Sequence, residues 1–384
     1  MGKTTNSLER MVEHFVKGET DKLQGEFALI KKYHLDIIQE LFDREDHPVY
    51  EDVAQQFGEL DRQINKTPSL SFDHDYDQVI CFGELLSTKI VTHYLQSQQV
   101  AATWKDVRLA IKTNNAYREA RVQWDITGEL VGQHFQFDGN RILVTQGFLG
   151  STIDNITTTL GREGSDYTGA VLAHVLHAEK LVIWKDVPGV LNADPKWFDD
   201  TVLLNELSYR DAIELAYYGA SVIHPKTIKP LQNKNIDLHV KSFLNPRANG
   251  TVISNVEYEK LIPSFIFKID QVLIRISPED FSFIAEDNLQ TIFGILSENR
   301  VKINLMQNSA LRFIICINND ERKLPKIIDA LKSNFNVTYE TGLELITIRY
   351  FDESTVERVM VNKELIMEHR DKKNIQLIVK NIGR

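Results

Sequence analysis

Residues 165–187 read SDYTGAVLAHVLHAEKLVIWKDV, which is a predicted helix followed closely by an apolar strand. The same alternation precedes this stretch, with predicted strands at 78–83 and 141–148 and a predicted helix at 83–95. Strands rich in Val, Ile and Leu that alternate with helices are typical of βαβ units around a buried parallel sheet. The sequence therefore predicts an α/β fold with a mostly parallel sheet flanked by helices, and function at the loops that follow the strands.

The two ends of the chain have other patterns. Residues 7–57 have apolar side chains at helical spacing, and a polar break at 71–78 separates them from the α/β region. After residue 258 the order becomes strand, helix, strand, strand, helix, strand, which is the ferredoxin-like order, and a second set starts at 343. We predict a catalytic domain over 1–258 and two small α+β modules, in tandem or interleaved, over 259–384.

Composition narrows the function classes. The 384 residues are 42% hydrophobic and 26% charged, as in soluble globular proteins, and the net charge of -10 argues against nucleic-acid binding. Cys81 and Cys316 lie in apolar runs and are predicted to be reduced core residues. No run is long and apolar enough for a membrane span or a signal peptide, so we expect a cytoplasmic protein without a membrane partner.

The densest group of polar and glycine residues is TTTLGREGSDYTG, at 157–169. Glycines allow backbone N–H groups to approach an anion, and Arg162 offers a fork suited to a carboxylate. Ser165 and Asp166 are expected to cap the helix that follows. The alternative interpretation, a glycine-rich turn with a capping Asp, is equally compatible with the local pattern.

Three further stretches follow predicted strands or turns. In CFGELLST (81–88), Glu84 either stabilises a helix dipole or holds a substrate ammonium. WKDVPGVLNADPK (184–196) is either ordinary turn chemistry or a site, and His224 in GASVIHPKT is predicted to cap a turn. The eleven histidines show no zinc-ligand spacing, so no metal ligands are predicted.

In this order, GELLST, TTLGREGSD, DVPGVLNADP and ELAYYGASVIHPKTI resemble the signatures of aspartate kinases in the amino-acid kinase family. The paired α+β modules resemble the ACT regulatory domains of that family. The resemblance implies transfer of a phosphoryl group from MgATP to the side-chain carboxylate of aspartate, a first step toward lysine, threonine and methionine. Such transfer relies on positioning and on charge stabilisation.

The resemblance also implies residue roles. Glu84 would hold the aspartate ammonium, Arg162 its α-carboxylate, and Asp166 would organise the phosphoryl site, while Thr5 would contact substrate. Residues expected at the nucleotide are Lys185, Asp186, Leu191, Lys196, Ser221 and Lys226. Residues expected at a lysine or threonine effector site are Met306 and Gln307, although Met306 is equally compatible with a strand core. A homodimer or larger homo-oligomer is implied.

The opening MGKTTN looks like a P-loop ending, but the resemblance identifies it with an internal loop of the family. We therefore expect that the chain begins inside the fold, without the family's Lys-Phe-Gly-Gly-Thr-Ser segment and its lysine. In addition, Glu163 replaces a glycine, Leu191 a tyrosine and Ser221 a lysine of the family pattern, and Lys185 or Lys226 is expected to substitute for that lysine. The alternative is a catalytically weak amino-acid-sensing subunit, and a glutamate or uridylate kinase ranks last because it leaves the C-terminal modules unexplained.

Overall fold

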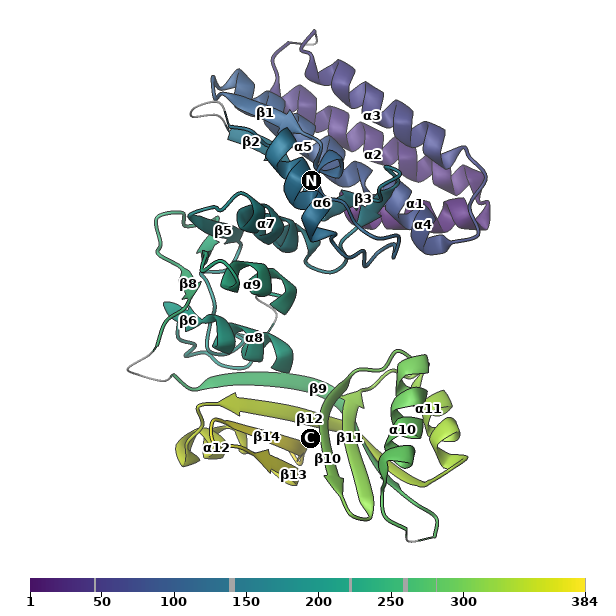
Figure 1. Cartoon of the computed structure of the whole chain (residues 1–384), viewed down its shortest axis with the longest axis vertical. Helices are drawn as coiled ribbons and strands as arrows, with labels where there is room; N and C mark the ends of the chain where they lie inside the picture. The colour runs from purple at the N-terminus through teal and green to yellow at the C-terminus, as the bar shows by residue number, and fades with distance from the viewer. Residues whose placement is uncertain (45, 138–141, 221–222, 258–261, 281, 384) are drawn as a thin grey trace. The chain divides into compact units, whose positions relative to one another are not determined.

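The computed structural model describes residues 1–44, 46–137, 142–220, 223–257, 262–280 and 282–383 (Figure 1). The chain forms two compact units. Unit 1 contains Met1–Ile183 and Ile223–His239, and unit 2 contains Trp184–Val222 and Val240–Arg384. The boundary between a catalytic and a regulatory domain at residue 258 is a separate matter and stays a prediction.

Helices at the start of unit 1 confirm the predicted helical region. They are α1 (Thr4–Lys17), α2 (Thr20–Leu41) and α3 (Val49–Ile64), followed by α4 (Phe72–Ile80) and α5 (Phe82–Ser97). In α1, Leu8, Met11, Val12 and Phe15 recur at three-and-four spacing and are buried. Gly18 ends α1 with a positive φ of 70°, a conformation that glycine adopts without steric cost.

The predicted strand at 78–83 is wrong. Residues 78–80 end α4 and α5 begins at Phe82, with Cys81 between the two helices. Val79, Ile80 and Cys81 are almost completely buried. A short, fully buried apolar run has no visible periodicity, so its sequence does not distinguish a strand from a buried helix end.

The remaining elements of the α/β region form small sheets. Strands β1 (Ala102–Lys105) and β2 (Ile142–Thr145) pair in parallel, and β3 (Leu149–Ser151) and β4 (Thr157–Thr159) pair antiparallel. A four-stranded sheet has the order β5-β7-β8-β6. Its strands are β5 (Lys180–Lys185), β6 (Glu206–Ser208), β7 (Asp237–Ser242) and β8 (Thr251–Ser254). The helical elements here are η1 (Val107–Leu109), α6 (Trp124–His134), α7 (Gly164–Val175), α8 (Tyr209–Tyr218) and α9 (Pro225–Gln232).

The mixed α/β content is confirmed, but the described residues hold three small sheets here instead of the one predicted sheet. One reason is that residues 78–83, expected to be a strand of that sheet, are helical.

The C-terminal part of unit 2 is one six-stranded sheet with the order β10-β11-β9-β12-β14-β13. Its strands are β9 (Ser264–Ser277), β10 (Ile303–Ser309), β11 (Arg312–Asn318), β12 (Asn336–Arg349), β13 (Lys363–Arg370) and β14 (Asn374–Asn381). Its helices are α10 (Glu286–Glu298), α11 (Leu324–Lys332) and α12 (Glu353–Val359). Strands β9 and β12 are antiparallel and pair along their whole length. Ser264 lies opposite Arg349 at one end, and Ser277 lies opposite Asn336 at the other, so both α+β modules share these two strands.

The modules are therefore interleaved, one of the two predicted arrangements. The strands predicted separately at 336–340 and from 343 are one strand, and β13 is an additional strand. Gly342 has a φ of 70° beside a register shift, and the sequence around it reads as a break. Cys81 and Cys316 are free and buried, as predicted.

Candidate active site

The three threonines of the glycine-rich stretch form β4 and are buried. Each hydroxyl has a partner outside β4: Thr157 accepts from Arg108 (3.2 Å), Thr158 lies 2.7 Å from the hydroxyl of Thr113, and Thr159 donates to Asp77 (2.7 Å). Because all three hydroxyls form hydrogen bonds within the protein, they hold in place the strand that leads into the loop.

The turn from 160 to 164 depends on two residues with positive φ. Gly161 has a φ of 75°, and a Cβ there would lie 2.9 Å from the carbonyl oxygen of Arg118. Glu163 has φ 54° and ψ 30°, a left-handed conformation that costs a side chain roughly 1–2 kcal/mol. The N–H of Gly164 donates to the carbonyl of Gly161 at 3.0 Å and closes the turn.

The predicted caps of α7 are wrong by two to three residues. The helix begins at Gly164 and its N-cap is Glu163, which makes no side-chain cap hydrogen bond. Ser165 and Asp166 lie in the first turn instead, where the carboxylate of Asp166 favours the helix dipole. Because Glu163 adopts the left-handed conformation, the turn is complete at that residue and α7 begins at Gly164. The helix therefore starts before Ser165 and Asp166, the residue types that usually act as N-caps.

Of the two loop residues with predicted roles, Arg162 is exposed and Asp166 is half-buried. Between them, the Oε2 atom of Glu163 is buried and accepts no hydrogen bond within the described part of the chain. The loop thus presents a guanidinium beside the N-terminus of α7, together with one carboxylate oxygen to which no described residue donates a hydrogen bond.

Lys226, in the first turn of α9, is tied to this loop. Its Nζ donates to the carbonyl oxygen of Leu160 at 2.8 Å and lies 5.6 Å from the ring centroid of Tyr167. Burial lowers the pKa of Lys226, while Glu119 and Glu163 act in the opposite sense. The structure therefore brings Lys226 together with the stretch that carries Arg162 and Asp166.

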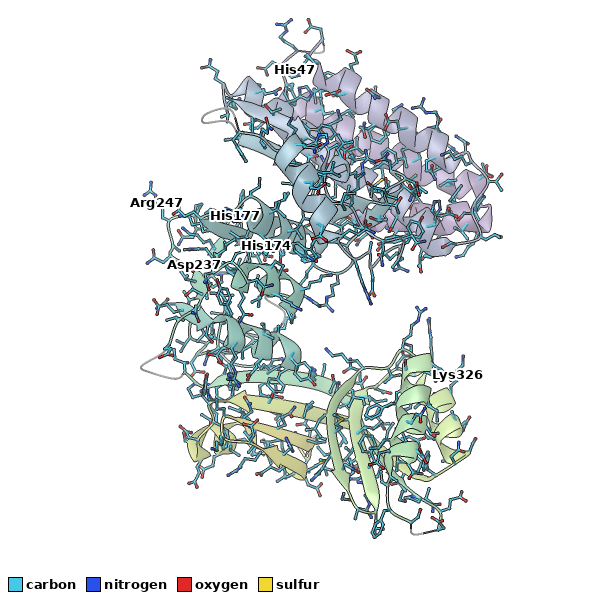
Figure 2. The ribbon with its side chains drawn as sticks, in the orientation of Figure 1. His47, His174, His177, Asp237, Arg247 and Lys326 are labelled. Carbon is cyan, nitrogen blue, oxygen red and sulfur yellow. The ribbon has the colours of Figure 1, made fainter. Side chains whose placement is uncertain are left out.

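The position of Lys226 is fixed at the start and end of α9. His224 is the N-cap and accepts from the N–H of Lys226 at 3.2 Å, which confirms that it caps a turn. Near the other end, Nδ1 of His174 on α7 lies 2.8 Å from the carbonyl oxygen of Pro230, and Figure 2 labels His174. Helices α7 and α9 consequently pack as a pair.

Glu84 and Thr5 lie on two helices that touch. Glu84 is half-buried in the first turn of α5, and burial raises the pKa of its carboxyl. Thr5 is exposed in the first turn of α1. A Cβ on Gly83 would lie 3.2 Å from Leu8 and 3.8 Å from Thr4, so the two helix starts are in close approach.

The other predicted nucleotide residues belong to unit 2. Lys185 ends β5, and its carbonyl accepts from the N–H of Phe243 at 2.7 Å. Asp186 and Lys196 are exposed, whereas Leu191 is half-buried in an isolated bridge with Leu203. Ser221 lies outside the described residues.

Met306 and Gln307 lie on β10, an edge strand of the six-stranded sheet. Met306 is 55% exposed, so the interpretation of Met306 as strand core is wrong. Gln307 is exposed beside it. Both side chains remain available for contact with a ligand or another chain.

Sequence reasoning missed two buried charged groups next to the site. Asp77 on α4 is completely buried and accepts a hydrogen bond from β4, but it stands in a polar run whose sequence predicts only a break between elements. Lys112 is 4% exposed, burial lowers its pKa, and its Nζ donates to the carbonyl of Arg108 and to Ser151 and Asn155. Both are found only when the fold is known.

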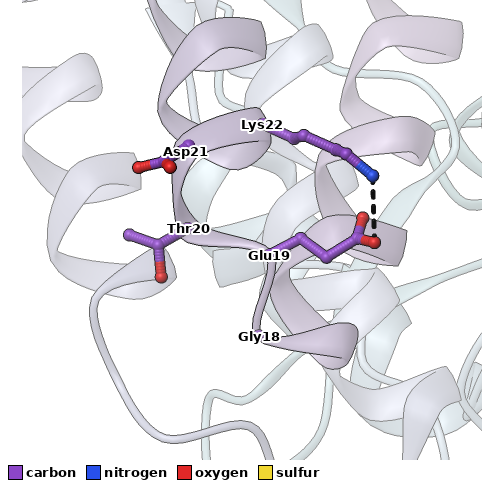
Figure 3. A pocket seen from close by; sticks show the side chains of 5 residues that line it. All are labelled: Gly18, Glu19, Thr20, Asp21 and Lys22. Atoms are coloured by element: carbon purple, nitrogen blue, oxygen red, sulfur yellow. Dashed lines mark hydrogen bonds and ion pairs between the residues drawn. The ribbon is translucent and has the colours of Figure 1, made fainter.

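A pocket of about 390 Å³ lies at the turn between α1 and α2 (Figure 3). It is lined by Gly18, Glu19, Thr20, Asp21 and Lys22, with an ion pair of 3.0 Å between Glu19 and Lys22. The predicted site residues are not among those that line it. Across the residues that the structure describes, no group of three or more His, Cys, Asp or Glu is arranged to hold a metal, and no helix is long and apolar enough to cross a membrane.

Comparison with known proteins gives consistent matches. The profile of the amino acid kinase family matches residues 2–242. The lysine-sensitive aspartokinase 3 of Escherichia coli is 32% identical over 285 residues, which cover 71% of this chain and 62% of that protein. The chloroplastic bifunctional aspartokinase/homoserine dehydrogenase 2 of Arabidopsis thaliana is 27% identical over 69% of this chain, which corresponds to 30% of its own length. The chain thus spans less than two thirds of these two relatives.

Two crystal structures of E. coli aspartokinase III are similar over 99% of this chain. The complex with aspartate and ADP has a TM-score of 0.81 at 26% identity and is matched over 88% of its length. The complex with lysine and aspartate has a TM-score of 0.80 at 25% identity and is matched over 87%. Since the family profile covers well over half of the chain and the fold agrees, the chain belongs to the amino acid kinase family.

Proposed function

We propose that the protein is an aspartate kinase, which transfers a phosphoryl group from ATP to the side-chain carboxylate of aspartate and forms 4-phospho-aspartate. The observation that carries the proposal is the similarity along 99% of the chain to an aspartokinase solved with aspartate and ADP. The expected cytoplasmic location stays a prediction.

The acceptor aspartate would be held by residues of unit 1. Glu84 supports this role, because burial penalises its charged form and an ammonium partner would offset that penalty. Arg162 is exposed and suited to bind the α-carboxylate in a bidentate manner. Thr5 is exposed on the helix next to that of Glu84 and would add a polar contact.

The phosphoryl group would be stabilised around the N-terminus of α7. Transfer of a phosphoryl group requires positive charge and N–H donors at the transferring oxygens, since charge accumulates there. Lys226 and the first turn of α7 supply such groups, and Asp166 would organise them. The carboxylate of Glu163 lies among these groups and opposes the binding of phosphate.

MgATP would be the donor substrate. We propose that MgATP contacts the nucleotide residues that the resemblance implies, including Ser221. Among them, Lys226 is supported by geometry, because its amine lies against the loop that carries Arg162. Burial penalises the charged form of its half-buried amine, and a phosphate partner would offset that penalty.

We further propose that the interleaved C-terminal modules are paired ACT domains that bind lysine or threonine and that the protein is a homodimer or larger homo-oligomer. Support comes from the strand and helix order and from the exposed edge strand that carries Met306 and Gln307. An unpaired strand edge is a suitable surface for pairing with another chain.

The test is aspartate-dependent ADP formation by the purified chain, with the acyl phosphate trapped by hydroxylamine. Glutamate and uridylate replace aspartate in parallel reactions. Arg162→Ala should raise KM for aspartate at least tenfold, whereas Arg62→Ala, an exposed arginine on α3, should change nothing. Lysine or threonine binding without turnover would identify the sensing subunit instead, and turnover of glutamate or uridylate alone would reject aspartate as substrate.

A further inference from the structure

We propose that Asp77 is a positioning residue that holds the 160–164 loop in its active arrangement and makes that arrangement dependent on pH. This inference rests on the proposed kinase function, because it assigns a role to the loop that carries Arg162. The role comes from the contacts that Asp77 makes on both sides of the loop.

The first side is the strand that enters the loop. One carboxylate oxygen of Asp77, Oδ2, accepts the N–H of Thr159 at 2.9 Å, and Oδ1 accepts the hydroxyl of Thr159 at 2.7 Å. The neighbouring Gln78 donates to the carbonyl of Thr157 at 2.8 Å. Helix α4 therefore holds β4 at both of its ends.

The second side is the backbone that the loop packs against. Oδ2 of Asp77 also accepts the N–H of Arg118 at 3.0 Å. The carbonyl oxygen of Arg118 lies only 2.9 Å from where a Cβ of Gly161 would be. A single carboxylate thus fixes the residue before the loop and the surface beneath its first glycine.

The three donors to Asp77 are two backbone N–H groups and a hydroxyl, all of them neutral. Burial outweighs these hydrogen bonds and raises the pKa of Asp77 to about 6. Because Oδ2 already accepts two N–H groups, the proton binds to Oδ1. The protonated Oδ1 then donates to the hydroxyl of Thr159, so this hydrogen bond reverses its direction. The two N–H groups at Oδ2 lose their ionised acceptor, and hydrogen bonds to a neutral acceptor are weaker, so protonation loosens the tie at the entrance of the loop.

The titratable groups around Asp77 include Tyr76, Tyr117 and Cys81. Burial raises the pKa of Tyr76 and Tyr117 above its ordinary value, and burial raises the pKa of Cys81 to about 12. The guanidinium of Arg118 pairs with Asp73 at 3.3 Å, and β4 contributes only threonines. On α4 itself, Nδ1 of His74 lies 3.0 Å from the buried carboxylate of Asp75, so a His74→Gln variant serves as a control.

The decisive variant is Asp77→Asn, which has the shape of the protonated side chain at every pH. The wild type is expected to show kcat/KM for aspartate that rises about tenfold between pH 5 and 7.5 with a midpoint near 6. Asp77→Asn should stay at the low-pH level throughout, through a higher KM for aspartate with KM for ATP unchanged. His74→Gln should keep the wild-type profile.

A second measurement does not depend on activity. Hydrogen exchange of a peptide covering 157–164, corrected for the intrinsic effect of pH, should be faster in the wild type at pH 5 than at pH 7.5. Asp77→Asn should exchange fast at both. Asp75→Asn is the matched control, because Asp75 is also buried on α4 but accepts from Ser69 instead of from β4.

An Asp77→Asn variant with the wild-type pH profile and wild-type exchange would overturn the inference. Absence of aspartate-dependent ADP formation in the wild type would overturn the proposed function alone, since the exchange measurement would still decide whether Asp77 holds the loop.

Discussion

Replacement of Glu163 by glycine is expected to stabilise the protein and to favour nucleotide binding. Glu163 has a φ of 54°, and a non-glycine residue there costs roughly 1–2 kcal/mol that glycine does not pay. Its buried Oε2, without a hydrogen-bond partner in the described structure, adds about 1–3 kcal/mol. Against this, glycine loses about 0.5–1 kcal/mol of backbone entropy on folding. The net gain in the free energy of unfolding is about 1–4 kcal/mol.

Glu163→Ala separates the two contributions, because alanine removes the carboxylate but keeps a Cβ at the positive φ. The free energy of unfolding in urea should be about 0.5–1 kcal/mol higher for Glu163→Gly than for Glu163→Ala. This difference is the relief of the left-handed conformation less the backbone entropy that glycine loses on folding. Both variants should lower KM for ATP, since both remove a negative charge next to Lys226. Equal stability of the alanine and glycine variants would refute the argument from backbone conformation, and a destabilised Glu163→Gly would refute all of it.

Four further outcomes follow from buried or half-buried charges. Arg349 is 1% exposed and pairs with Asp211 and Glu214. Because Arg349→Met leaves two carboxylates without their partner, urea titrations should show a loss of about 3–5 kcal/mol in the free energy of unfolding, and a loss below 1 kcal/mol would contradict this. Burial acts to raise the pKa of Asp211, but hydrogen bonds from Tyr350 and Arg349 hold this pKa below its ordinary value. The wild type should therefore be more stable than Asp211→Asn above pH 4, and the difference in the free energy of unfolding should shrink as the pH falls below 4. For Asp77 the sign is reversed, because burial of its carboxylate costs more than its hydrogen bonds to the loop return. Against global unfolding, Asp77→Asn should therefore be more stable than the wild type by about 3 kcal/mol above pH 6 and equal to it below pH 4, although its 157–164 segment is held less tightly, and the opposite trend would contradict the raised pKa. Lys226→Ala should raise KM for ATP at least tenfold, whereas Lys229→Ala, exposed on the same helix, should not; similar effects of both would discard the role of Lys226.

Elements with a strong period were predictable from sequence. Helix α1 buries one face and exposes the other, so Leu8, Met11 and Phe15 identify it without any knowledge of its neighbours. The same holds for α11 and for the order of the C-terminal modules. In contrast, residues 78–83 are buried on all sides, so their pattern carried no period and the predicted strand was a helix end.

The predicted site was found in part. The composition of the stretch at 157–169 identifies it as a candidate site. The sequence does not show, however, that the threonine hydroxyls of this stretch form hydrogen bonds with Arg108, Thr113 and Asp77. These partners come from elements more than 40 residues away along the chain, and such contacts leave no local trace.

The chemical groups and their order along the chain can be read without a structure, because glycines, caps and amphipathic periods act over a few residues. The sequence identifies the family for the same reason, since the signatures are short and contiguous. Three features required the folded chain: the two modules share β9 and β12, Glu163 adopts a left-handed conformation, and Asp77 accepts hydrogen bonds from the strand that enters the loop. Those features depend on burial and on pairing between distant segments, which arise when the chain is packed.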